Sequence, residues 1–238
     1  MRKKLKQLNM VILIYARLSS KRLPNKVLCK INSKPLLSLV IDRIKKISSY
    51  KIPIIVISSK HHSDNRLENY CINKKINFFR GDLNNVFNRT LQCSKIYNFK
   101  SFIRVCADRP FFDVRLMDKM IKKFEEKRYE IVTNQFPRTY PKGLACEIAD
   151  INIFRKLNQK KLNPYDKEHI FNFFYRNNKN YNIFNFLLKN SKKIRNIDYS
   201  LNNKKDLLKT RKIYNNFSSS KYIDILEITK KNESTKYT

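Results

Sequence analysis

Short apolar runs alternate along the chain with longer segments in which apolar residues recur every three or four positions. The short runs, rich in Ile, Val and Phe, are typical of buried strands. They predict strands at Met10–Ala16, Pro53–Ser58, Asn77–Phe79, Phe102–Cys106, Ile131–Thr133, Cys146–Ala149, Ile183–Leu188 and Ile194–Ile197. Helical spacing predicts helices at Leu36–Ile47, Asp64–Lys74, Val86–Tyr97, Arg115–Lys127, Ile151–Leu157, Lys167–Tyr175 and Lys204–Asn216. This alternation indicates an α/β fold, with a mostly parallel twisted sheet and helices on both faces.

The two ends of the chain differ in composition from the part between them. No internal repeat interrupts residues 1–216, and we expect them to form a single domain. Residues 217–238 are rich in Ser, Lys and Thr and predict a C-terminal tail, loosely ordered or with a short helix around Ile223–Ile228. The basic N-terminus resembles a signal peptide, but its apolar run is short and is followed at once by Arg17. We therefore expect a first strand there, no membrane span and a cytoplasmic protein.

The composition is strongly basic and poor in glycine. Fifty-two Lys and Arg against 19 Asp and Glu give a formal charge of +33, which suits a polyanionic partner. However, the Lys-Lys pairs are dispersed along the chain, and Lys, Asn and Ile share A/T-rich codons. We therefore interpret most of the charge as background and do not expect a nucleic-acid partner, with a polyanion-binding surface as the alternative. Two glycines exclude a Walker-type phosphate loop, and five cysteines without a Cys-x-x-Cys pair indicate free thiols rather than zinc ligands.

Ligands of such sheets bind outside the carboxyl ends of the strands, so the residues that follow each strand are the candidates for chemistry. The segment after the first strand carries Arg17, Arg22 and Lys26 together with Ser19 and Ser20. These cations and hydroxyl groups suit a polyphosphate. The alternative is an ordinary basic loop in a basic protein.

Two aspartates also close predicted strands, Asp108 before Arg109-Pro110 and Asp198 after Ile194–Ile197. Mg²⁺ is held by one or two carboxylates plus substrate phosphates, and two aspartates at the same sheet edge fit such a site. The alternatives are a helix cap for Asp108 and a turn for Asp198.

Several motifs occur in a fixed order over residues 9–216. They are Ala16-Arg17-x-x-Ser20-x-Arg22-Leu23-Pro24-x-Lys26, Lys34-Pro35-Leu36-Leu37, Phe79-Arg80-Gly81 with Val86 and Arg89, Arg104-Val105 with Asp108 and Pro110, Asn134 with Pro137–Pro141, Gly143-Leu144 and Glu147, Pro164-Tyr165-Asp166 with Glu168-His169, Tyr175-Arg176-Asn177, and Asp198. In this order they resemble the cytidylyltransferase family that activates acidic sugars with CTP, such as acylneuraminate and KDO cytidylyltransferases. The nearest branch is the one of spore coat polysaccharide biosynthesis.

The resemblance implies a nucleotide-diphospho-sugar transferase (GT-A-like) fold and a Mg²⁺-dependent transfer of CMP from CTP to an acidic sugar, with release of pyrophosphate. It implies nucleotide binding by Ala16, Arg17, Ser19, Ser20, Arg22, Lys26, Arg80 and Arg89. It implies catalytic roles for Arg17, Lys26 and Asp108, and metal binding by Asp108 and Asp198. It implies substrate binding by Arg138, Tyr140, Lys142, Glu147 and His169. A structural role for His169 is the alternative. Relatives commonly pair as dimers, so a homodimer is compatible with the resemblance.

The chain departs from the family pattern close to the expected nucleotide site. Ser19, Asn25, Ser33 and Ala107 stand where the family usually has glycine, Tyr15 replaces a Gln, Asn85 and Asn88 replace acids, and Ala145 replaces an Asp. Asn tolerates a left-handed backbone, so it is the mildest of the glycine replacements. Two alternatives follow from these changes. One is a nucleotidyltransferase that uses another nucleoside triphosphate or a sugar 1-phosphate, and the other is a catalytically degenerate relative that binds nucleotide or polyanions.

Overall fold

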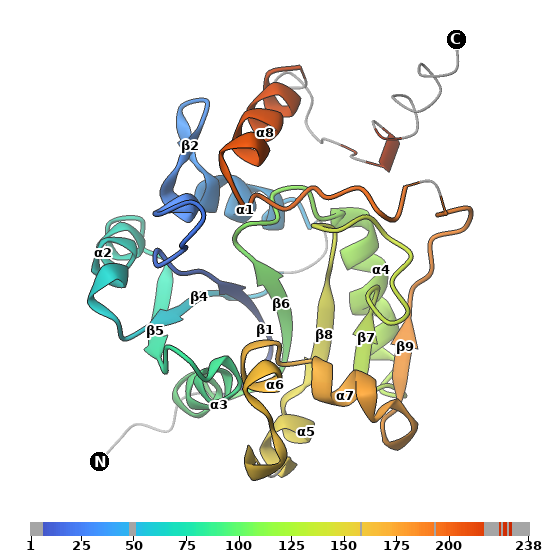
Figure 1. Cartoon of the computed structure of the whole chain (residues 1–238). Helices are drawn as coiled ribbons and strands as arrows, with labels where there is room; N and C mark the ends of the chain where they lie inside the picture. The colour runs from blue at the N-terminus through green and yellow to red at the C-terminus, as the bar shows by residue number, and fades with distance from the viewer. Residues whose placement is uncertain are drawn as a thin grey trace.

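A single seven-stranded sheet organises the chain in the computed structural model, which describes residues 7–47, 51–157, 159–192 and 194–216 together with 224, 226, 227 and 229 (Figure 1). The strands are β1 (Leu8–Tyr15), β4 (Ile54–Ser59), β5 (Asn77–Gly81), β6 (Phe99–Cys106), β7 (Ile131–Thr133), β8 (Glu147–Asp150) and β9 (Ile183–Asn185). Their order across the sheet is β5-β4-β1-β6-β8-β7-β9. All neighbouring pairs are parallel except those of β8, which runs antiparallel to β6 and β7. The mostly parallel sheet predicted from the sequence is thus confirmed.

Helices cover both faces of this sheet. They are α1 (Leu36–Ile44), α2 (Asn65–Asn73), α3 (Val86–Tyr97), α4 (Val114–Glu125), α5 (Ile151–Lys156), α6 (Pro164–Glu168), α7 (Asn172–Arg176) and α8 (Lys204–Asn216). A small antiparallel hairpin of β2 (Lys30–Ile31) and β3 (Lys34–Pro35) leads into α1 and contacts α8. Short 3-10 turns lie at Lys26–Leu28, His62–Asp64, Gln159–Lys161 and Asn178–Asn180.

The core has two layers because successive residues of the central strand β1 point to opposite faces of the sheet. Ile12 and Ile14 pack with side chains of α1 and α4, such as Val40 and Met117. On the other face, Val11 and Leu13 pack with aromatic side chains from α3, α5 and α7. These are Phe87, Phe154 and Phe174. Both layers are fully buried, which holds the sheet rigidly beneath its carboxyl edge.

Two predicted elements differ from the structure. The helix predicted at Lys167–Tyr175 is replaced by two short helices, α6 and α7. Helix α6 starts earlier than predicted because Asn163 caps it in a capping box with Asp166, and it ends at His169, whose backbone is not helical. The strand predicted at Ile194–Ile197 is not formed, and residues 194–196 lie in turns. Its apolar residues are used differently, since Ile194 is buried and Ile197 packs against a small cluster that contains Phe111.

Part of the predicted C-terminal tail contacts the domain. The Asp224 carboxylate accepts hydrogen bonds from the backbone of Leu226 and Glu227 and forms an ion pair with Arg115 at the start of α4. Thr229 is buried and its hydroxyl group lies 2.5 Å from that of Tyr199. The remaining residues of the predicted tail, including Ile223 and Ile228, lie outside the described residues.

Candidate active site

The carboxyl ends of β1, β4 and β6 meet at one edge of the sheet. The backbone ladder continues one residue beyond the strands, since Ala16 N donates to Ile57 O at 3.1 Å and Ala107 N donates to Tyr15 O at 3.0 Å. Ala16 therefore starts the segment of residues 16–28, here called the first loop, directly over the sheet. The three strand ends hold this loop beside the turn that carries Asp108.

The first loop is anchored by Asp64, a fully buried carboxylate that follows β4. One carboxylate oxygen accepts a hydrogen bond from Leu18 N at 2.7 Å. The other oxygen accepts hydrogen bonds from the backbone N–H of Ser59, at 3.2 Å, and from its hydroxyl group. Because these buried donors need a partner, Asp64 fixes the start of the loop relative to β4.

A left-handed residue turns the loop back toward the sheet. Asn25 has φ 58°, its N–H donates to Leu18 O at 3.1 Å, and Lys26 follows as the first residue of a 3-10 turn. The expectation that Asn25 tolerates a left-handed conformation is confirmed. Ser19 and Ala107 have negative φ, so neither position needs glycine for its backbone conformation.

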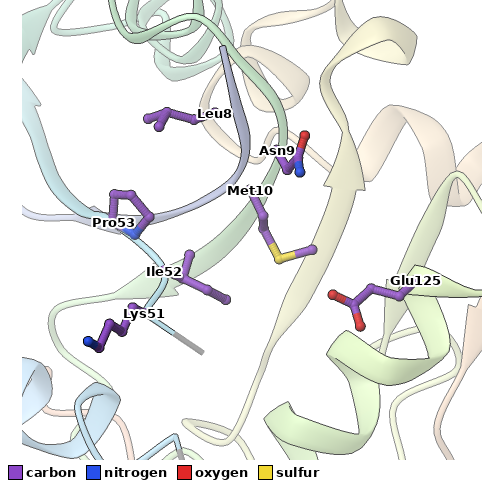
Figure 2. A pocket seen from close by; sticks show the side chains of 7 residues that line it. All are labelled: Leu8, Asn9, Met10, Lys51, Ile52, Pro53 and Glu125. Atoms are coloured by element: carbon purple, nitrogen blue, oxygen red, sulfur yellow. The ribbon is translucent and has the colours of Figure 1, made fainter. Parts of the chain in front are cut away.

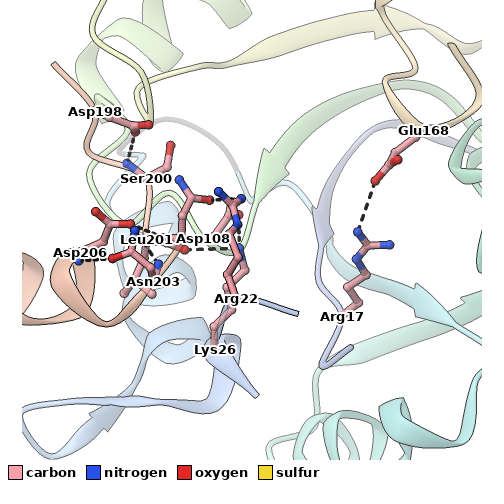
Figure 3. A network of polar contacts seen from close by, with 11 residues as sticks. Arg17, Arg22, Lys26, Asp108, Glu168, Asp198, Ser200, Leu201, Asn203 and Asp206 are labelled. Atoms are coloured by element: carbon pink, nitrogen blue, oxygen red, sulfur yellow. Dashed lines mark hydrogen bonds and ion pairs between the residues drawn. The ribbon is translucent and has the colours of Figure 1, made fainter. Parts of the chain in front are cut away.

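Lys26 and Asp108 come together across this edge. The Lys26 Nζ atom lies 2.6 Å from Asp108 Oδ2, and both side chains are largely buried, with exposed fractions of 13% and 25% (Figure 3). Burial alone would raise the pKa of Asp108, but the Lys26 ammonium and the Arg109 guanidinium outweigh it and lower that pKa. Asp108 is therefore an ionised carboxylate at neutral pH.

The residues 198–203, here called the closing segment, lie against this ion pair. Leu201 N donates to the Asp108 backbone oxygen at 2.8 Å, and Lys26 Nζ donates to Leu201 O at 3.3 Å. Arg22 donates to the Asn202 side chain at 3.3 Å. In Figure 1 the chain passes from β9 over the carboxyl end of β6 before it enters α8. The closing segment thus joins the first loop to the end of β6.

Asp198 begins the closing segment, but its carboxylate makes a local contact. Its Oδ1 atom accepts a hydrogen bond from Ser200 N at 2.7 Å, and its backbone forms an isolated bridge with Lys142 (Figure 3). No hydrogen bond joins Asp198 to Asp108. Among the described residues no group of three Asp, Glu, His or Cys side chains is suited to a metal ion. The donor set still fits Mg²⁺, which takes one or two carboxylates and leaves its other positions to phosphates and water.

Three further arginines were predicted to bind the nucleotide, and they come from the first loop, β5 and α3. Arg17 forms an exposed ion pair with Glu168 at 3.2 Å, which links the first loop to α6. The Arg80 guanidinium is bound by protein atoms of the turn after β4 and of α2, including Ser59 O at 2.8 Å. Arg89 is buried and donates to the Asp82 backbone oxygen at 3.0 Å. Arg17 belongs to the first loop and points toward Glu168 (Figure 3).

The predicted substrate residue Glu147 is buried in a polar network on the β8 side. It forms an ion pair with Arg104, its partner across the β6–β8 pairing, and accepts a hydrogen bond from the Tyr175 hydroxyl group at 2.8 Å. The Arg104 guanidinium also lies 5.6 Å from the centre of the Tyr15 ring. Burial raises the pKa of Tyr175 well above its ordinary value, so its hydroxyl group stays protonated and donates to Glu147.

The other residues predicted to bind the substrate are Arg138, Tyr140, Lys142 and His169. Arg138 donates to the backbone oxygens of Tyr140 and Arg195, and Lys142 lies beside the closing segment. Tyr140 itself is buried, and burial raises the pKa of its hydroxyl group. His169 lies at the end of α6, with its ring 4.3 Å from that of Tyr165. Partial burial, together with nearby cations, lowers the pKa of His169, which keeps its imidazole neutral at pH 7.

A pocket at the opposite edge of the sheet carries different chemistry. It measures about 390 Å³ and is lined by Leu8, Asn9, Met10, Lys51, Ile52, Pro53 and Glu125 (Figure 2). These residues lie at the amino ends of β1 and β4 and at the C-terminus of α4. Among the described residues that line it, Lys51 and Glu125 are the charged ones, whereas the carboxyl edge gathers several cations with Asp108.

Comparison with known proteins agrees with this geometry. The charged groups gather at the carboxyl edge of the sheet, where α/β proteins bind their ligands. Residues 11–233 match the cytidylyltransferase family, and the chain belongs to this family. As expected, no helix among the described residues is long and apolar enough to span a membrane.

Two related proteins and one solved structure show what the chain is similar to. The uncharacterized protein MJ1063 of Methanocaldococcus jannaschii is 29% identical over 69% of this chain and 66% of its own length. The spore coat polysaccharide biosynthesis protein SpsF of Bacillus subtilis is 27% identical over 68% of each protein. The chain therefore spans about two thirds of the length of these relatives. A cytidylyltransferase structure from Leptospira borgpetersenii is 25% identical, with a TM-score of 0.85 over 96% of both chains.

Proposed function

We propose that the chain transfers CMP from CTP to the hydroxyl group of an acidic sugar, releases pyrophosphate, and serves surface polysaccharide synthesis. The observation that carries this proposal is the contact of 2.6 Å between Lys26 Nζ and Asp108 Oδ2. A cation suited to phosphate and a carboxylate suited to a metal ion thus share one point at the carboxyl edge of the sheet. The relationship to a spore coat polysaccharide biosynthesis protein supports the role in polysaccharide synthesis.

In this proposal the first loop binds the triphosphate. Arg17, Arg22 and Lys26 face its negative charge, and Lys26 exchanges its contact with Asp108 for one with a phosphate oxygen. Asp108, with Asp198 from the closing segment, would hold Mg²⁺. When bound, this ion neutralises charge on the triphosphate and on the departing pyrophosphate.

The reaction itself is a substitution at the α-phosphorus. The sugar oxygen forms a bond to this phosphorus, the bond to the bridging oxygen of the β-phosphate breaks, and the hydroxyl proton is released. Such a reaction depends mainly on alignment and on charge neutralisation, and it needs no covalent nucleophile. The rigid contacts of Asp64 and Leu201 with the first loop and the Asp108 turn supply the alignment.

The test is pyrophosphate release from each of the four nucleoside triphosphates, measured with a panel of acidic sugars and with and without Mg²⁺. We expect release only with CTP, metal and an acidic sugar, and a loss of roughly 100-fold or more in Asp108→Asn, as for other electrostatic groups at a reaction centre. Asp42→Asn is the matched control, because Asp42 pairs with Lys34 on the exposed surface. Absence of metal-dependent turnover with any triphosphate, or full activity of Asp108→Asn, would contradict the proposal.

A further inference from the structure

Arg109 stands out among the arginines of the candidate site. It follows Asp108 in the turn after β6, where its N–H donates to Cys106 O at 3.1 Å, and it is half-buried. The other site arginines bind protein atoms through their guanidinium groups, namely Arg17, Arg22, Arg80, Arg89, Arg104 and Arg138. Within the described residues, no hydrogen bond or ion pair involves the Arg109 guanidinium.

The position of Arg109 places this free cation near Asp108 and near the neighbouring strand β8. Strand β6 lies between β1, which leads into the first loop, and β8, which begins with Glu147. Lys26 reaches Asp108 from the first loop. The Arg109 guanidinium helps to lower the pKa values of Asp108 and His169 and opposes the raised pKa of Cys146, which directly precedes β8. Arg109 therefore lies near the start of β8 as well as near Asp108.

Three carboxylates around the end of β6 already have cationic partners. Asp108 contacts Lys26, Glu147 contacts Arg104, and Glu168 contacts Arg17. Asp198 accepts a hydrogen bond from Ser200 N, and no ion pair joins it to Arg109. A half-buried guanidinium has lost part of its hydration and gains most from an anion that accepts two parallel hydrogen bonds. A ligand with an anionic group would supply such a partner for Arg109.

We propose that Arg109 binds the carboxylate of the sugar acceptor and thereby selects acidic sugars. This inference rests on the proposed function. It gives the binding of the sugar carboxylate to Arg109, a residue that the sequence pattern did not indicate. Arg138, which the family resemblance implies for substrate binding, already donates to two backbone oxygens. A sugar phosphate offers similar anionic oxygens, so the experiment includes one.

Binding titrations test the assignment on wild type and on Arg109→Met. The ligands are 3-deoxy-manno-octulosonate, N-acetylneuraminate and glucuronate, the carboxamide of each acid, glucose 1-phosphate and CTP with Mg²⁺. The sugars are titrated both with and without nucleotide. Arg128→Met is the matched control, because Arg128 is an exposed cation after α4, at the opposite edge of the sheet. Arg109→Lys keeps the charge without the planar fork, and thermal melting shows whether each variant is folded.

We expect wild type to bind at least one acid about 10- to 100-fold more tightly than its carboxamide, the range of a charge-assisted hydrogen-bonded pair. Arg109→Met should abolish this preference for the acid and leave the affinity for CTP within about twofold of wild type. Arg109→Lys should keep part of the preference for the acid. Arg128→Met should have the same affinities as wild type.

Several results would overturn the assignment. They are an acid preference that survives in Arg109→Met, equal binding of acids and amides by wild type, an equal loss of CTP affinity, or a loss confined to glucose 1-phosphate. Failure of wild type to bind CTP would instead refute the proposed function, because the comparison of acid with amide does not need nucleotide.

Discussion

Replacing Asp64 by alanine should destabilise the protein strongly although Asp64 is not expected to touch a substrate. Its carboxylate accepts three hydrogen bonds, one from Leu18 N and two from the N–H and hydroxyl groups of Ser59. Hydrogen bonds to a charged group contribute about 1.5 to 3 kcal/mol each, and water that enters the small cavity recovers part of this. We therefore expect a loss of about 3 to 5 kcal/mol, a large share of the ~5 to 15 kcal/mol that stabilises a typical domain.

Urea unfolding followed by far-UV circular dichroism measures this loss. Asp64→Asn retains one carbonyl acceptor and should fall between wild type and Asp64→Ala. The control is Asp42→Ala, because the Asp42–Lys34 ion pair is about half exposed and should contribute less than about 1 kcal/mol. If Asp64→Ala and Asp42→Ala lose the same free energy of unfolding, Asp64 does not anchor the first loop and the reasoning is wrong.

Two further perturbations probe the closing segment and the acid stability of the fold. Gly143 has φ +87°, and a Cβ atom there would lie 2.6 Å from Ser200 N. Gly143→Ala should therefore lower the free energy of unfolding by about 2 to 4 kcal/mol in urea titrations, and an unchanged midpoint would contradict this. Burial alone would raise the pKa of Asp166, but Arg176 and Asn172 outweigh it and lower that pKa. The folded state therefore binds this proton less readily than the unfolded state, and stability should fall as pH drops below about 4. Asp166→Asn should flatten this pH dependence in thermal melts, whereas an equally steep loss would exclude Asp166 as its source.

Much of the fold could be predicted because the apolar pattern there reflects local geometry. Helices α3 and α8 begin and end where their periodicity does, and β7 also matches its prediction. The pattern was misleading where tertiary packing dominates. Ile194–Ile197 has the composition of a strand, but Ile194 is buried and Ile197 is partly buried in a turn-rich segment. The early start of α6 had a local signal, the capping residue Asn163 before Pro164.

The candidate site was predicted in part and missed in its supporting residues. The order of motifs placed Lys26 and Asp108 at one sheet edge, but it did not predict the ion pair that they form there. Asp64 was interpreted only as the start of a helix, since nothing in a sequence shows that a carboxylate will be buried beneath a loop 46 residues away. Arg109 was missed for a different reason. Its interest lies in having no partner among the described residues, and an absent contact leaves no trace in a sequence.

The scarcity of glycine has a thermodynamic consequence at the positions where the backbone is left-handed. Asparagine occupies four of these positions, with positive φ at Asn25, Asn32, Asn98 and Asn190. An asparagine has fewer backbone states than glycine in the unfolded chain, so less conformational entropy is lost when such a position folds. Its left-handed conformation carries some steric strain, which opposes this gain. At Asn25 this restriction acts directly before Lys26, and it would limit the backbone states from which Lys26 reaches Asp108.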